Sequence, residues 1–276
     1  MVGATAFPES PAVHPAERDI FMTIYTIAFP KGGTTKTTTA VELTSYLAAR
    51  GSRVLAIDLD EQGTMTAWLG FNTESEIEGT AADVLKDNVP VIEAASDVPS
   101  IPGAKALVGT HELTNVNQFT VPELITTLQF ALPAAAEHFD DVVIDAPPTL
   151  GGLTFSALLA ADVVIAPVAC EGQATDQIDR FEHLVTTRLA PRARPGLKIN
   201  VLLPTRYDGR RRLDREVLEL LETRFGDRIQ IAPPIRESVV VKDSYVSAEP
   251  VGRYAPESNP ALDYIAAFDA IVGKGA

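Results

Sequence analysis

The stretch Phe29-Pro30-Lys31-Gly32-Gly33-Thr34-Thr35-Lys36-Thr37-Thr38 lies between an apolar run and a helical pattern. The apolar run, residues 22 to 28, predicts a strand, and apolar spacing over residues 36 to 50 predicts a helix that ends before Gly51. A glycine turn between a strand and a helix leaves backbone N–H groups unpaired at the positive end of the helix dipole. Such a turn attracts phosphate groups.

The residue types in this loop predict a nucleoside triphosphate site. Glycines at positions 32 and 33 let the backbone approach an anion, because no Cβ is in the way. Lys36 can place an ammonium group on the outer phosphates, and Thr37 stands where such loops provide a hydroxyl ligand for Mg²⁺. The predicted nucleotide-binding residues are Lys31, Gly32, Gly33, Thr34, Thr35, Lys36, Thr37 and Thr38.

Two more predicted strands end in carboxylates. Residues 53 to 59 lead into Asp58-Leu59-Asp60, and residues 141 to 145 end at Asp145. In an extended chain Asp58 and Asp60 point to the same face, and open α/β sheets bind their ligands at the carboxyl ends of strands. A buried parallel strand explains the apolar run 142 to 144 but not the charge that follows it. We therefore interpret Asp145 as a Walker B carboxylate.

Together these motifs resemble the ParA/MinD family of deviant Walker A ATPases. The loop is similar to the family pattern K-G-G-x-G-K-T, and residues 58 to 63 (DLDEQG) and 144 to 148 (IDAPP) resemble D-x-D-P-Q-G and I-D-x-P-P. The resemblance covers roughly residues 22 to 272. It implies an α/β fold, a mostly parallel twisted sheet with helices on both faces.

The resemblance also implies ATP and Mg²⁺ as cofactors and an ATPase reaction. The catalytic residues would be Lys31, Lys36 and Asp60: the two lysines would stabilise the phosphates, Lys31 across a dimer, and Asp60 would position the attacking water. The metal site would consist of Thr37, Asp58 and Asp145. Residues 149 to 154 would form a mobile switch segment.

Thr35 departs from the family pattern, which has glycine at this position. A β-branched residue is disfavoured wherever the backbone needs a positive φ. The sequence therefore leaves two alternatives at Thr35, an ordinary backbone or a strained one.

Residues 188 to 215 carry nine of the 23 Lys and Arg residues and only two acidic residues. In the family the matching segment opens a helix, and its arginine, here Arg210, contributes to sequence-independent DNA binding by the ATP-bound dimer. Arg and Lys bind phosphate backbones without reading bases. The predicted DNA-binding residues are Arg206, Arg210, Arg211, Arg212 and Lys242. The alternative is a solvated basic loop, or arginines paired with the acidic rest of the chain.

Composition limits the classes of protein further. A chain of 276 residues that is 46% hydrophobic can bury one large core, so we expect an irregular arm over residues 1 to 20 and one domain over residues 21 to 276. The net charge of −14 argues against a globally basic nucleic-acid protein but allows a local patch. The single cysteine, Cys170, excludes an intrachain disulfide and a Cys-rich metal or iron–sulfur site within one chain.

We therefore predict a partition ATPase that acts as an ATP-dependent homodimer on nonspecific DNA with a centromere-binding (ParB-type) adaptor. Its predicted location is cytoplasmic and nucleoid-associated, because no signal peptide, membrane span or basic C-terminal helix is present in the sequence. One alternative is a MinD-like ATPase that positions a protein assembly or acts at a membrane without DNA. A metabolic or iron–sulfur-carrying relative would need more thiols than the single cysteine provides, which argues against that class. A nucleotide-binding regulator without turnover remains an alternative because of Thr35.

Overall fold

The chain folds around one twisted sheet. The computed structural model describes residues 22–116 and 121–273, so the predicted arm over residues 1 to 20 lies outside the described residues. The sheet has eight strands in the order β3-β4-β2-β5-β1-β6-β7-β8. Every pair is parallel except β3 with β4. The strands are β1 Thr23–Ile27, β2 Val54–Asp58, β3 Ser96–Asp97, β4 Ala104–Leu107, β5 Asp141–Asp145, β6 Val163–Ala169, β7 Val201–Thr205 and β8 Gln230–Ile231.

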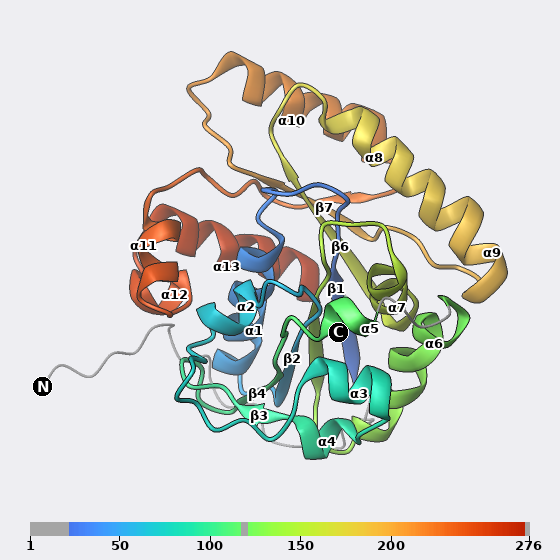
Figure 1. The fold of residues 1–276 in the computed structure, drawn as a ribbon. Helices are drawn as coiled ribbons and strands as arrows, with labels where there is room; N and C mark the ends of the chain where they lie inside the picture. The colour runs from blue at the N-terminus through green and yellow to red at the C-terminus, as the bar shows by residue number, and fades with distance from the viewer. Residues whose placement is uncertain (1–21, 117–120, 274–276) are drawn as a thin grey trace, which may run out of the picture.

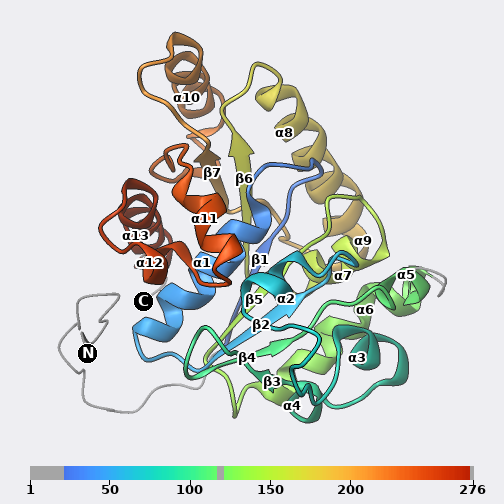
Figure 2. The ribbon, with the colours of Figure 1, turned by 60° about the vertical axis from the view of Figure 1, so that its left-hand side comes forward.

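Helices cover both faces of the sheet, as Figures 1 and 2 show. Helices α1, α11, α12 and α13 lie on one side, and α6, α7, α8 and α9 lie on the other. The predicted fold class is therefore confirmed. The helices are α1 Lys36–Ala49, α2 Thr64–Trp68, α3 Ala81–Asp87, α4 Val91–Ala94, α5 Leu113–Val116, α6 Val121–Ala131, α7 Gly152–Ala160, α8 Ala174–His183, α9 Ala190–Ala193, α10 Arg212–Phe225, α11 Val240–Val246, α12 Val251–Tyr254 and α13 Asn259–Val272.

Alternation along the strands produces two buried cores. In β1, Ile24 packs into the core that α6, α7 and α8 cover, whereas Tyr25 and Ile27 pack into the core that α1 and α13 cover. Successive side chains of a strand point to opposite faces, so one strand serves both cores. Within the described ranges, no helix combines the length and the apolarity needed to cross a membrane.

Local signals in the sequence set several element boundaries. Gly51 has φ +84 after α1, and the N–H groups of Gly51 and Ser52 bond the carbonyls of Ala48 and Leu47, so the predicted helix end is confirmed. α6 gives way to a 3₁₀ turn, Leu132–Ala135, which contains Pro133, a residue that lacks the N–H needed to continue an α-helix. A π-helical turn, Leu184–Leu189, joins α8 to α9.

Candidate nucleotide-binding site

The glycine loop connects β1, in the middle of the sheet, to α1. A Cβ at Gly32 or Gly33 would meet no atom within 4 Å, so the loop surface is open at both glycines. The ammonium of Lys36 donates to the carbonyl oxygen of Lys31 at 2.9 Å and so curls back over the loop. This arrangement leaves a concave backbone with a cation at its rim, which suits a phosphate group.

Thr35 is strained. Its φ of 66° and ψ of 26° place it in the left-handed region directly before α1. For a residue with a Cβ this conformation costs roughly 1–2 kcal/mol. The carbonyl of Thr35 accepts two hydrogen bonds from Thr39, one from the amide at 2.9 Å and one from the hydroxyl at 2.8 Å, which hold the residue in place. Of the two alternatives left by the sequence, the structure shows the strained one.

Asp145 ends β5, between β1 and β2, and lies directly behind the loop. It is 1% exposed, and within the described residues neither carboxylate oxygen has a hydrogen-bond partner. Burial raises the pKa of Asp145 well above its usual value, and the charge of Asp58 acts in the same direction, whereas Thr37 and Lys36 oppose the shift. The Thr37 hydroxyl and the Lys36 ammonium thus lie near Asp145, but a buried carboxylate that no donor bonds directly is costly unless a further cation joins it.

Asp58 stands beside Asp145 in register but faces its own loop. Its oxygens accept hydrogen bonds from the amide of Asp60 at 3.0 Å and from the amide and hydroxyl of Thr66 at 2.9 and 2.8 Å. Burial raises the pKa of Asp58 to about 6 although these donors lower it. Gly109 packs directly against this carboxylate and donates its N–H to Thr66 at 2.8 Å. Motif reasoning missed Thr66 and Gly109.

Asp60 lies outside the strand and is half-buried. Its carboxylate accepts a hydrogen bond from the amide of Gln62 at 3.0 Å. Burial lowers the pKa of Lys36, and the charges of Asp145 and Asp60 oppose this effect. The structure thus brings Lys36, at the start of α1, into one electrostatic group with Asp60 and Asp145.

The side-chain oxygens of this group decide whether it could hold a metal ion. The described residues contain no cluster of three or more His, Cys, Asp or Glu side chains that could hold a metal ion by themselves. Mg²⁺ is normally held by one or two carboxylates together with substrate phosphates and water. The unpaired oxygens of Asp145 beside the Thr37 hydroxyl fit that pattern, whereas the carboxylate of Asp58 is already occupied by three donors.

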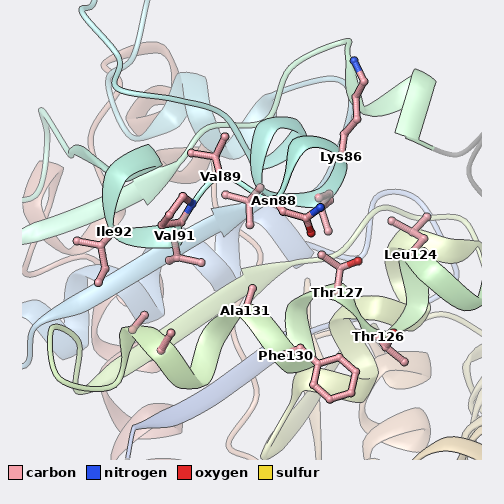
Figure 3. Close-up of a pocket in the computed structure, with 15 residues that line it drawn as sticks. Lys86, Asn88, Val89, Val91, Ile92, Leu124, Thr126, Thr127, Phe130 and Ala131 are labelled. Carbon is pink, nitrogen blue, oxygen red and sulfur yellow. The ribbon is translucent and has the colours of Figure 1, made fainter.

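The described surface carries a hollow beside the loop and a groove away from it. The hollow is a cavity of about 570 Å³ and is lined by Gly33, Thr35, Arg206, Lys242 and Tyr264, among others. The groove, of about 750 Å³, runs between α3, α4 and α6 (Figure 3). The residues that line the groove include none of the predicted site residues, so only the cavity belongs to the nucleotide site.

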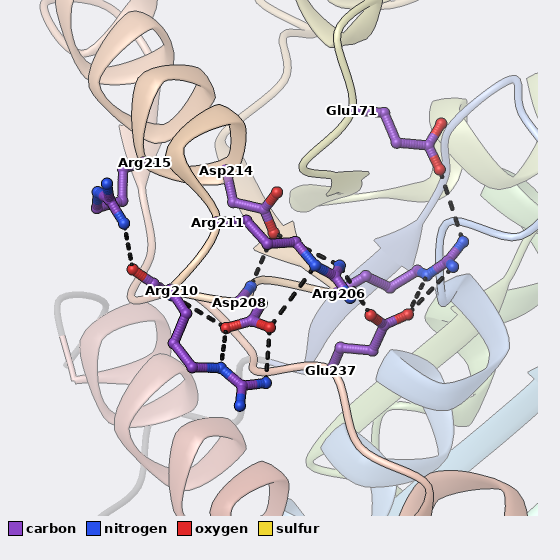
Figure 4. A network of polar contacts seen from close by, with 9 residues as sticks. Glu171, Arg206, Asp208, Arg210, Arg211, Asp214, Arg215 and Glu237 are labelled. Atoms are coloured by element: carbon purple, nitrogen blue, oxygen red, sulfur yellow. Dashed lines mark hydrogen bonds and ion pairs between the residues drawn. The ribbon is translucent and has the colours of Figure 1, made fainter.

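The predicted DNA-binding arginines are paired with carboxylates, and Figure 4 shows the pairs of Arg206, Arg210 and Arg211. These ion pairs are Arg206 with Glu237 at 3.2 Å, Arg210 with Asp208 at 2.8 Å, Arg211 with Glu237 at 3.0 Å and Arg212 with Glu216 at 2.6 Å. Lys242, on α11, is exposed at the cavity beside the glycine loop. Arg210 and Arg212 remain 91% and 85% exposed, so their pairs are open to exchange with solvent anions.

Comparison with known proteins agrees with this geometry. A family model described as an AAA domain matches residues 22–199. The sporulation initiation inhibitor protein Soj of Bacillus subtilis is 32% identical over 91% of this chain and 99% of its own. The chromosome partitioning protein ParA of Caulobacter vibrioides is 34% identical over 84% of this chain and 86% of its own. The chain belongs to the ParA/Soj family of P-loop ATPases.

This ParA/Soj chain is similar in structure to a protein that was solved with bound ligands. Cobyrinic acid a,c-diamide synthase from Mycobacterium smegmatis, solved with a bound ATP analog and magnesium, is 29% identical over 91% of this chain and 95% of that one, with a TM-score of 0.74. The similarity covers most of this chain, so the fold of this chain is one that holds an ATP analog and magnesium in that protein.

Proposed function

We propose that this chain is a partition ATPase that hydrolyses ATP with Mg²⁺, forms an ATP-dependent homodimer, binds DNA without sequence preference and segregates plasmid or chromosome cargo with a ParB-type adaptor. The observation that carries the ATPase part is the buried, unpartnered carboxylate of Asp145 behind the glycine loop. Such a group is stabilised when a cation arrives with the phosphates. A nucleoid-associated location in the cytoplasm would follow from the DNA part.

Each residue of the site has its own role in phosphoryl transfer. The loop amides and Lys36 would bind the phosphates, and Thr37 and Asp145 would hold Mg²⁺, which would offset phosphate charge. Asp60 would orient the attacking water, because it is half-buried in the loop after β2 and its charge acts on Lys36. Asp58 keeps the loop of Asp60 in place through its bond to the Asp60 amide. Positioning and charge stabilisation carry such reactions.

The base of the nucleotide has a place beside the loop. The cavity of about 570 Å³ continues from Gly33 and Thr35 to the apolar side chains of Ile235, Val239 and Val241. An aromatic base could be buried there while the phosphates stay on the loop amides.

The DNA part is supported by the exposure of the arginine loop. Arg210, in the loop before α10, and Arg212, the first residue of α10, are exposed and paired with Asp208 and Glu216 respectively. DNA phosphates can replace such partners, because exposed ion pairs contribute little. On a chain with a net charge of −14, this local patch would give binding that weakens steeply with salt.

A binding experiment with random-sequence duplex DNA tests the proposal. It compares ATP, ADP and no nucleotide across a salt series, using wild type, Arg210→Ala and a control, Arg224→Ala, which removes an arginine paired with Asp179 at the far end of α10. We expect binding with ATP only, and Arg210→Ala should lower both the affinity and the salt slope, the slope by about one. The control should match wild type.

Lys36→Ala tests whether DNA binding depends on bound nucleotide. This variant should lose nucleotide binding and, with it, ATP-dependent DNA binding, because its ammonium is the cation at the rim of the loop. If wild type binds ATP but no nucleotide state binds DNA at low salt, the DNA part is wrong. The search would then turn to a protein surface as the track.

A further inference from the structure

Glu171 contacts two cations at the edge of the nucleotide site. Its carboxylate lies 2.6 Å from the ammonium of Lys31 and 3.6 Å from the guanidinium of Arg206, as Figure 4 shows for the Arg206 pair. The three residues follow β6, β1 and β7, which are neighbours in the sheet. One carboxylate therefore links the lysine of the glycine loop to the first arginine of the basic segment.

The backbone of Arg206 is held in an uncommon conformation. Its φ is +54°, in the left-handed region that residues with a Cβ rarely adopt. Hydrogen bonds fix the chain on both sides, from the amide of Cys170 to the carbonyl of Thr205 and from the amide of Tyr207 to the carbonyl of Ile235. Strained residues that the surrounding structure holds in place are concentrated at functional sites.

The position of Arg206 differs from those of Arg210 and Arg212. It lines the cavity beside the loop together with Gly33 and Thr35, and its side chain is 46% exposed. By contrast, Arg210 is 91% exposed and Arg212 is 85% exposed. Its location is therefore that of a ligand-facing residue, whereas Arg210 and Arg212 face solvent.

We propose that Arg206 is a nucleotide-binding residue rather than a DNA-binding residue, and that Glu171 competes with the phosphates of a bound nucleotide for Lys31 and Arg206. This inference rests on the proposed function, because its ligand is a nucleoside triphosphate. The Glu171 carboxylate competes with phosphate oxygens for the N–H donors of both cations. Full contact between these cations and phosphate therefore requires the two ion pairs to break. Glu171 thus restrains both cations until phosphate replaces it.

The charge state of Glu171 agrees with this competition. The hydrogen bond from Lys31, together with the charges of Lys31 and Arg206, lowers the pKa of Glu171, so the carboxylate is ionised at neutral pH. The contact with Lys31 is half-exposed, with side-chain exposures of 31% and 48%. Pairs of this kind contribute little, so the expected effect on affinity is about two- to fivefold.

Equilibrium binding of a fluorescent ATP analogue to the full chain tests the inference. We expect Glu171→Gln to tighten binding about two- to fivefold, since half-exposed pairs are weak. Arg206→Gln should weaken binding several-fold, and Arg206→Lys should recover most of the loss. The matched control is Arg211→Gln, because Arg211 shares Glu237 with Arg206 without contacting Glu171, and it should bind the analogue like wild type.

Two further measurements make the result decisive. Thermal unfolding of each variant establishes that it is folded, and the double variant Glu171→Gln/Arg206→Gln shows whether Arg206 acts on the nucleotide when Glu171 no longer competes. We expect the double variant to bind more weakly than Glu171→Gln alone. With saturating ATP analogue, Arg206→Gln should bind duplex DNA within about twofold of wild type, since Arg210 and Arg212 are intact.

The inference is wrong if Arg206→Gln binds nucleotide like wild type but loses DNA binding, or if Glu171→Gln does not tighten nucleotide binding. A different result contradicts the proposed function, namely that wild type itself binds no nucleotide. The wild-type titration therefore distinguishes the two failures.

Discussion

Thr35 shows how one residue can break a family pattern while the loop keeps its shape. The backbone there adopts φ 66°, a conformation that glycine takes without cost. The chain compensates through the two hydrogen bonds from Thr39 to the Thr35 carbonyl. The strain is therefore stored at the entrance of α1, directly beside the cation Lys36.

Replacing Thr35 with glycine should release this strain. We expect Thr35→Gly to raise the free energy of unfolding by about 1 kcal/mol, because the relief of left-handed strain exceeds the added entropy of the unfolded chain. Urea denaturation without nucleotide measures the change. The control Thr35→Ala keeps a Cβ and should give no comparable gain. A Thr35→Gly variant less stable than wild type would show that the side chain contributes more than its backbone costs.

Also at the scale of residues, the sequence motifs predicted the positions of the site residues in the fold better than they predicted the contacts of the side chains. Lys36 and Asp145 meet at the strand ends because their motifs specify a strand, a turn and a helix. The contacts that occupy the Asp58 carboxylate could not be predicted, because its donor Thr66 and its neighbour Gly109 come from other segments. The pairing of Arg206 with Glu171 and Glu237 likewise depends on how distant segments fold together.

At the scale of elements, β4 is, like its antiparallel partner β3, a strand that sequence analysis did not predict. Its residues, Ala104-Lys105-Ala106-Leu107, lack the β-branched and aromatic side chains that favour strands. Parallel pairing with β2 makes it a strand nonetheless. The chain leaves β4 through Gly109, whose absent side chain allows close approach to the Asp58 loop.

A methyl group at Gly109 should disturb this packing. A Cβ there would lie 2.7 Å from Cγ of Asp58 and 2.9 Å from the carbonyl oxygens of Asp58 and Asp60, and backbone atoms cannot move aside cheaply. We expect Gly109→Ala to destabilise the chain by roughly 1–3 kcal/mol through overpacking and to lower ATP turnover by moving Asp60. Chemical denaturation and steady-state phosphate release measure the two effects.

Gly172→Ala provides the matched control for this variant. A Cβ at Gly172 would meet nothing within 4 Å, and its backbone is not in the left-handed region. Its stability should stay within about 0.5 kcal/mol of wild type, as for most surface substitutions. Equal losses in the two variants would mean that the Asp58 contact does not explain the effect.

At the scale of the whole molecule, a buried carboxylate ties the glycine-loop helix to the C-terminal helices. Glu42 lies in α1, is 2% exposed, and accepts hydrogen bonds from the amides of Val251 and Gly252 at the start of α12, at 2.5 and 3.0 Å. Burial raises the pKa of Glu42 to about 7 even though both amides lower it. Segments far apart in the sequence therefore share one titrating group.

This group should make stability depend on pH. The ordinary pKa of 4.5 applies in the unfolded chain, and the folded value is about 7, so the folded chain binds the proton more tightly. The contribution is complete below the unfolded pKa and is lost as the pH rises through the folded one. The difference corresponds to a loss of roughly 2–3 kcal/mol in the free energy of unfolding between pH 5 and pH 8.

Glu42→Gln isolates the effect, because an amide can still accept one of the two hydrogen bonds but does not titrate. Urea denaturation at pH 5, 6, 7 and 8, followed by the fluorescence of the single tryptophan, Trp68, measures both proteins, and the indole of Trp68 donates to the carbonyl of Glu249 beside α12. We expect wild type to lose stability relative to Glu42→Gln as the pH rises. Parallel pH curves would show that Glu42 is ionised equally in both states, and that the tie between α1 and α12 is a permanent charge rather than a proton-dependent one.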